Sequence, residues 1–235
     1  MRQTGVGVQL NQQERLFLGL VEQLTRPLLA ISHLSEVATM SEDWQTVRVL
    51  ANSSLRLAEG YALSLRVHGK VAPLQLEPVT VSALLYDAAE GIEPFAQRYG
   101  VSVELNTGPR VQPVVADRQV LQSAFESLGQ VFVLAQAESE TPGSVYLMAH
   151  RSRHGAVAGL YSGSMQLGVE SLRRARAVQG RAHQPLQQFV DGPAAGVFVA
   201  ESLLGTLSAR LHVARYHNLS GLATTLQPSQ QLQLI

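Results

Sequence analysis

The sequence predicts an α+β protein in which an N-terminal helical hairpin is followed by an α/β sandwich. Two observations lead to this prediction. The first 67 residues carry apolar side chains at spacings of three and four, which is typical of amphipathic helices. Beyond residue 78, segments with helical spacing are separated by short runs in which apolar and polar residues alternate, as in strands. This mixture favours helices packed on one face of a mixed sheet.

Composition limits the possible function classes. The 235 residues are 46% hydrophobic and 15% charged, which is enough for one sizeable core or two small ones. Lys+Arg and Asp+Glu number 18 each, so no net field attracts nucleic acid or a membrane surface. The absence of cysteine excludes disulfides and thiolate chemistry. No apolar run approaches the ~20 residues that span a bilayer, and no leader segment is evident, so we expect a cytoplasmic protein.

The N-terminal region is expected to form two helices. An apolar stripe interrupted by Pro27 predicts the first over roughly residues 11 to 39. Ser41, followed by two acidic residues, is a suitable N-cap for the second. The second helix carries a regular three-four repeat, made of Trp44, Val47, Ala51, Ser54, Ala58, Tyr61 and Leu65.

This repeat forms an apolar seam along one face of the helix, and such a seam needs a second helix to cover it. Two hairpins from two chains would form a dimeric four-helix bundle, so we expect a homodimer through residues 1–67. The alternative is an intramolecular helical layer that packs on the remainder of the chain.

Residues 68–78 are expected to be a linker, because His68-Gly69-Lys70 and two nearby prolines break the helical pattern. Residues 79–235 then form a second domain. An extended run is expected over residues 74–79, and further strands over 101–105, 145–148, 156–161, 211–216 and 223–226. Helices are expected over 81–99, 117–132 and 192–207.

One segment of the first helix resembles the phosphoacceptor helix of histidine kinases, which reads His-x-Leu-x-x-Pro-Leu-x-x-Ile. The segment is Leu24-Thr25-Arg26-Pro27-Leu28-Leu29-Ala30-Ile31, and the position of the phosphorylated histidine is held by Glu22. The resemblance implies that the outward helix face docks a response regulator. The residues within about 40° of one another on that face are Arg15, Glu22, Arg26 and His33. The alternative is an ordinary solvated helix face.

The second domain is similar to the ATP-binding domain of histidine kinases, which has the GHKL ATPase fold. Glu77-Pro78-Val79-Thr80-Val81 precedes a helix that ends in Arg98-Tyr99-Gly100, as the family's entry strand and first helix do. Asp117 begins an Asp-x-x-x-Leu-x-x-x-Leu-x-x-Leu spacing with Phe125 at its second apolar position. The distance from Gly196-Val197 to Arg210-Leu211 also matches the family.

The chain departs from the family at the nucleotide site. The positions of the two asparagines of the central helix hold Ser127 and Val131. The Asp-x-Gly-x-Gly motif reads Tyr161-Ser162-Gly163-Ser164-Met165, and the following Gly-x-Gly reads Ala194-Ala195-Gly196. The resemblance therefore implies a degenerate nucleotide site without a cofactor, in which Tyr161 fills the adenine pocket. The seven histidines lack metal-binding spacings, so no metal is expected.

The function expected from these features is that of a histidine-kinase-like interaction protein that is not an enzyme. It would bind a response regulator receiver domain or another histidine kinase, and neither nucleic acid nor a membrane. Two alternatives remain open. One is a histidine phosphotransferase that uses His33, about 16 Å along the helix from Glu22. The other is a residual ATPase or kinase.

A basic cluster lies where the family has its mobile ATP lid. Its members are Arg173, Arg174, Arg176, Arg181 and His183. It would either bind a phosphate or an acidic partner surface, or form a solvated loop.

Overall fold

The structure is a computed structural model that describes Pro27, Ile31 and residues 41–68, 73–109, 111–139, 143–163, 172, 173, 176 and 194–229. Within these ranges no helix is long and apolar enough to cross a membrane. Pro27 and Ile31 are helical. The remainder of the first predicted helix lies outside the described residues, and so do Arg15, Glu22, Arg26 and His33.

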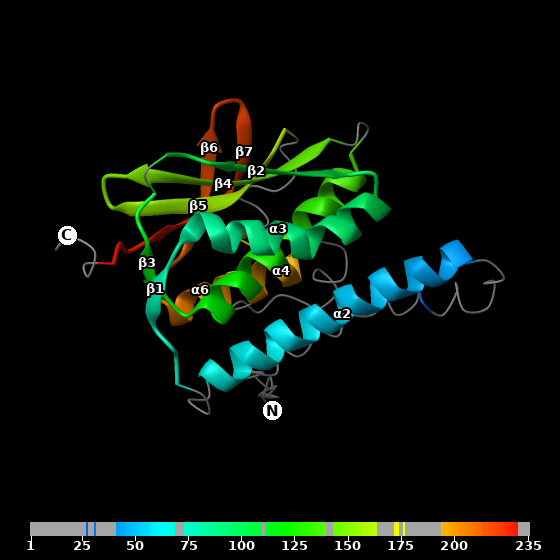
Figure 1. Ribbon diagram of the computed structural model, residues 1–235, viewed down its shortest axis with the longest axis horizontal. Helices are drawn as coiled ribbons and strands as arrows, with labels where there is room; N and C mark the ends of the chain where they lie inside the picture. Colours follow the sequence, from blue (N-terminus) through cyan, green and yellow to red (C-terminus); the bar gives the residue numbers. More distant parts are fainter. Residues whose placement is uncertain are drawn as a thin grey trace, which may run out of the picture.

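The centre of the fold is a mixed sheet of five strands in the order β2-β4-β5-β7-β6 (Figure 1). The strands are β2 (Ser102–Thr107), β4 (Ser144–Ser152), β5 (Gly155–Ser162), β6 (Leu211–Tyr216) and β7 (Leu219–Leu226). β2 is parallel to β4, and the other neighbours are antiparallel. The expected mixed sheet is therefore confirmed.

A separate antiparallel pair consists of β1 (Glu77–Val79) and β3 (Val114–Ala116). β1 falls within the predicted extended run, whereas β3 was not predicted. Three residues are too few to show alternation, and β3 is held by its pairing with distant residues: the Val115 N–H donates to the Gln227 carbonyl at 3.3 Å.

Three helices cover one face of the sheet: α3 (Val81–Arg98), α4 (Arg118–Ala137) and α6 (Ala194–Thr206) (Figure 1). α3 ends as predicted before Gly100, which has a φ of +66° that suits glycine. α4 begins after Asp117, whose carboxylate accepts a hydrogen bond from the Val120 N–H at 3.1 Å. Helices and sheet share one apolar core, so the predicted α+β class is confirmed.

The fourth described helix, α2 (Ser41–His68), packs on α4 and α6 on the side away from the sheet (Figure 1). Among the residues of α2 whose burial the structure describes, the buried ones are Thr46, Leu50, Ser53, Ser54, Gly60, Leu63 and Ser64. The predicted seam is divided between two faces, because Ser54 is buried whereas Trp44 and Ala51 are exposed. The alternative of an intramolecular helical layer agrees with the packing of this inner face on α4 and α6.

Two glycines let α4 lie unusually close to its neighbours. A Cβ at Gly129 would overlap Ile92 Cδ1 of α3. A Cβ at Gly196 would overlap Val131 Cγ2 and lie 3.2 Å from the Ser127 carbonyl oxygen. α4 is therefore held between α3 and α6 with no room for one more methyl group at either contact.

Gly196→Ala is expected to destabilise the fold by about 1–3 kcal/mol, because the added methyl must displace Val131 and the α4 backbone. Gly205→Ala is the matched control in the same helix, since nothing lies within 4 Å of its Cβ position. The control is expected to stabilise by about 0.5–1 kcal/mol through helix propensity. Urea unfolding of both variants gives the measurement. Equal effects would show that α4 and α6 are not in the close contact described.

Candidate functional site

Three of the predicted nucleotide-site positions meet where α4 and α6 cross beneath α2. Ser127 and Val131 lie one turn apart on α4, and Gly196 packs against both. Ser127 is 4% exposed and Val131 1%, and Gly196 is also buried. In this arrangement the three positions form a packed helix junction.

α2 covers this junction with small residues. A Cβ at Gly60 would lie 3.7 Å from Ser127 Oγ, and the Ser64 and Ser202 hydroxyls are 3.1 Å apart. The Gln130 amide donates to the Ser53 carbonyl at 3.4 Å. These α2 residues were not among the predicted site residues. The signal that was present is the spacing of small residues along one helix face, from Ser53 to Gly60 and Ser64.

The expectation that Tyr161 fills a pocket beside these residues is wrong. Alternate residues of β5 point to opposite faces of the sheet. Leu160 belongs to the core beneath the helices, whereas Tyr161 packs with Met148 and Ala223 in a second cluster. Tyr161 therefore lies on the sheet face opposite the helices.

The surroundings of Tyr161 are aromatic. Its ring centroid lies 6.4 Å from that of Tyr216, which stacks on His150 at 4.9 Å. Burial, together with Tyr216, raises the pKa of Tyr161 to about 12. Burial also lowers the pKa of His150 below its usual value. Both side chains are thus held neutral near pH 7 on this face.

The residue of this motif on the helix side is Ser162, which follows Leu160 at a spacing of two and is 3% exposed. Strand alternation was the sequence signal that could have identified it. Gly163 is exposed at the end of the strand. Met165 lies outside the described residues, and Ala194 is the first residue of α6.

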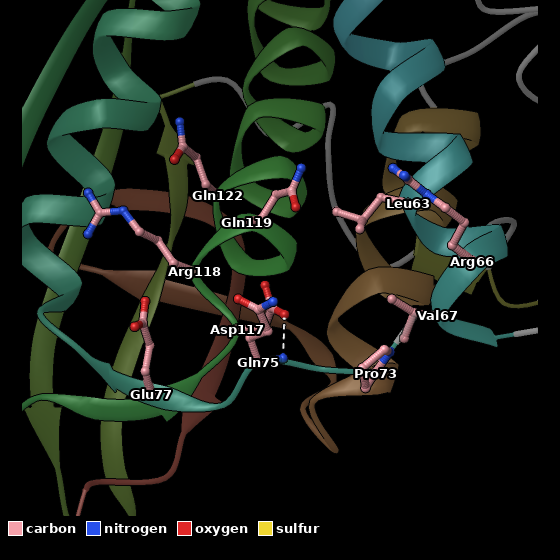
Figure 2. Close-up of a pocket in the computed structure, with 10 residues that line it drawn as sticks. All are labelled: Leu63, Arg66, Val67, Pro73, Gln75, Glu77, Asp117, Arg118, Gln119 and Gln122. Atoms are coloured by element: carbon pink, nitrogen blue, oxygen red, sulfur yellow. Dashed lines mark hydrogen bonds between the residues drawn. The ribbon is translucent and has the colours of Figure 1, made fainter. Parts of the chain in front are cut away.

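A cavity of about 390 Å³ lies at the start of α4 (Figure 2). α2 contributes Leu63 and Arg66, and α4 contributes Gln119 and Gln122 to its walls. The Asp117 carboxylate accepts a hydrogen bond from the Gln75 N–H at 2.8 Å, which fixes the chain entering β1. The walls hold both signs of charge and three amide side chains, so the cavity suits a neutral polar group more than an anion.

No cluster of three metal-binding side chains occurs within the ranges that the structure describes. The basic cluster is represented there by Arg173 and Arg176. The Arg176 guanidinium pairs with the Glu201 carboxylate at 2.9 Å and also donates to the Leu211 carbonyl. Glu201 accepts from the Leu211 N–H at 2.7 Å. Arg176 therefore joins α6 to the edge strand β6, which is a structural role.

Comparison with known proteins identifies the fold. No family model matches the sequence, and no curated protein matches it either. Among solved structures, the histidine kinase AdeS of Acinetobacter baumannii matches with a TM-score of 0.55 and 11% identity, over 87% of this chain and 96% of that chain. Full-length ShkA, solved in complex with AMPPNP, matches with a TM-score of 0.53 and 18% identity. That match covers 92% of this chain and 46% of ShkA. The chain has a histidine-kinase-like fold.

These matches correct one conclusion drawn from the sequence. The departures at the nucleotide motifs led to the prediction that the chain is not an enzyme. That prediction is wrong, because the structural neighbours are histidine kinases, an enzyme family. The prediction that Tyr161 fills the adenine pocket also contributed to that conclusion, and the structure has this side chain on the sheet face opposite the helices.

The raised pKa of Tyr161 predicts a specific alkaline transition. The folded pKa is about 12 and the unfolded pKa about 10, so Tyr161 stabilises the fold fully below pH 10. This contribution is lost as the pH rises from 10 to 12. In a spectrophotometric titration at 295 nm, the difference between wild type and Tyr161→Phe should show one tyrosine that ionises near pH 12. A difference curve centred at pH 10 would contradict the buried placement.

Proposed function

We propose that this protein is a histidine-kinase-like component of a two-component pathway, and that it binds a response regulator receiver domain or another histidine kinase. One observation carries the proposal: a helical arm followed by a mixed sheet with three helices on one face, in an arrangement that matches a histidine kinase over 87% of this chain. The described arm, α2, supports a role in contacts with partners because two large apolar side chains, Trp44 and Leu55, are exposed on its outer face.

The receiver-binding surface is proposed to be the outward strip of the first helix. Arg15, Glu22, Arg26 and His33 share one face of that helix on the helical wheel. Glu22 takes the place of the phosphoacceptor histidine, so a carboxylate is permanently present there. A receiver domain that recognises this strip would respond to a fixed charge pattern.

We also propose that residues 1–67 form a dimerisation unit, joined by residues 68–78 to the ATPase-like domain of residues 79–235. Trp44 is 64% exposed and Leu55 57% exposed, and Ala51 lies between them on the same helix face. This strip is opposite the face that packs on α4 and α6. Exposed Arg48 and Glu59 lie beside these apolar residues. Apolar residues flanked by charges are well suited to contact a second helix, and a second copy of the hairpin supplies one.

The intact chain is accordingly expected to be a dimer at micromolar concentration by light scattering. Trp44→Glu combined with Leu55→Glu should give a folded monomer with the far-UV circular dichroism of the wild type, because both side chains are exposed in the single chain. Tyr86→Glu on α3 is the matched control, since Tyr86 is 54% exposed but lies on another helix. A monomeric wild type, or a dimer that survives the double change, would exclude dimerisation through this strip.

Capture of a receiver domain tests the signalling role. Purified receiver domains encoded beside this protein should bind the immobilised chain, and Arg26→Glu should weaken binding by at least about tenfold by reversing a charge in the strip. Arg98→Glu, an exposed charge reversal at the end of α3, should leave binding within about twofold. If wild type, Arg26→Glu and Arg98→Glu capture the receiver equally, the strip is an ordinary solvated face.

A further inference from the structure

The cavity at the start of α4 has two different walls (Figure 2). The apolar wall is made of Leu63, which is 7% exposed, half-buried Val67, and Pro73 of the following chain. On the α4 side, Asp117 is buried and the Gln119 amide points across the cavity toward Leu63. The volume of about 390 Å³ lies within the range of known small-molecule sites. An apolar wall opposite a polar one suits a small amphipathic ligand.

Asp117 supplies a negative charge to the polar side. Its carboxylate accepts one hydrogen bond from the Gln75 N–H at 2.8 Å and one from the Val120 N–H at 3.1 Å. Both donors are neutral backbone groups, and a carboxylate can accept about four hydrogen bonds. The neighbouring Arg118 points away from α2 and pairs with Asp87 of α3. Within the described part of the chain, Asp117 therefore has no paired cation and keeps acceptor sites for one.

Arg66 brings a positive charge to the α2 side. It follows Leu63 by three residues, so the two side chains lie on neighbouring parts of one helix face. Arg66 is exposed and borders the cavity. Its guanidinium is suited to a carboxylate, because its donors form a fixed fork that two oxygens can accept. The cavity thus joins a group that attracts ammonium, a group that attracts carboxylate, and an apolar wall.

We propose that this cavity binds a free α-amino acid with an aliphatic side chain. Asp117 receives the ammonium group, with the Gln119 amide beside it. Arg66 receives the carboxylate, and the apolar wall covers the aliphatic side chain. A zwitterion pairs with both charges, whereas a simple anion or cation leaves one of them unpaired. The proposal does not depend on nucleotide binding or on the identity of a signalling partner.

L-leucine is the probe for this site. Isothermal titration calorimetry of the intact chain should give one site per chain with a Kd of about 100 μM or below. Isocaproate lacks the ammonium group of leucine, and isoamylamine lacks its carboxylate. Each should bind at least about tenfold more weakly, because one charged side chain then stays unpaired. No binding of L-leucine at about 10 mM, or equal binding of the three probes, would overturn the proposal.

The role of Asp117 is tested by Asp117→Asn, which removes the charge but keeps a good N-cap for α4. The variant should bind L-leucine at least about tenfold more weakly and isocaproate within about twofold of wild type, because isocaproate has no ammonium group. Glu104→Gln is the control, since Glu104 is an exposed acid of β2 that does not line the cavity. It should change neither affinity. Equal weakening of both probes by Asp117→Asn would overturn the assignment of the ammonium group.

Arg66→Gln provides the mirror test. It should weaken L-leucine at least about tenfold and leave isoamylamine within about twofold, because isoamylamine has no carboxylate. Arg98→Gln, an exposed charge at the end of α3, is the control and should change neither affinity. Unchanged L-leucine binding by Arg66→Gln would overturn the assignment of the carboxylate.

Val67→Phe tests the position of the site without changing a charge. The larger side chain should occupy the cavity and abolish binding of all three probes, while far-UV circular dichroism stays that of the wild type, because Val67 is only half-buried. Retained L-leucine binding in the folded Val67→Phe variant would show that the ligand binds elsewhere.

Discussion

The close packing of α4 against two other helices is the constraint on which the rest of the structure depends. Because Gly129 and Gly196 have no Cβ, Ile92 of α3 can pack against Gly129 and Val131 of α4 can pack against Gly196. α4 is therefore enclosed on both sides. With the sheet beneath it and α2 above it, α4 is buried along most of its length. Any polar residue on its upper face must then find a partner on α2, and among the described residues Gln130 Oε1 has none.

Local chemistry decided how well each element could be predicted. Asp117 and Gly100 mark helix ends by mechanisms that need no tertiary contact, and the structure has both ends where the sequence predicts them. β3 has no such signal, because its three residues are held by β1 and by the chain near Gln227. α4 continues past Phe132 to Ala137 because its later residues are buried as well. Tertiary burial extended the helix beyond its local pattern.

The error at Tyr161 shows which sequence signal is stronger in a strand. The glycine spacing of the Asp-x-Gly-x-Gly motif led to the prediction that Tyr161 lies at the nucleotide site. A shift of one residue along a strand, however, moves a side chain to the opposite face of the sheet. Ala156, Ala158 and Leu160 are all in the core beneath the helices, so the alternation assigns that face to Ser162. The nucleotide-site prediction at this strand therefore failed because spacing between glycines was given more weight than the two-residue period.

The described faces of α2 differ in what they contact. Leu50 and Leu63 are buried against the domain together with small residues such as Ser53, whereas Trp44 and Leu55 are exposed on the opposite side. Burial of apolar surface favours association, so Trp44 and Leu55 are the described residues of this helix that gain most from being covered. Because the two faces are opposite, a partner helix that contacts Trp44 and Leu55 does not compete sterically with α4 and α6.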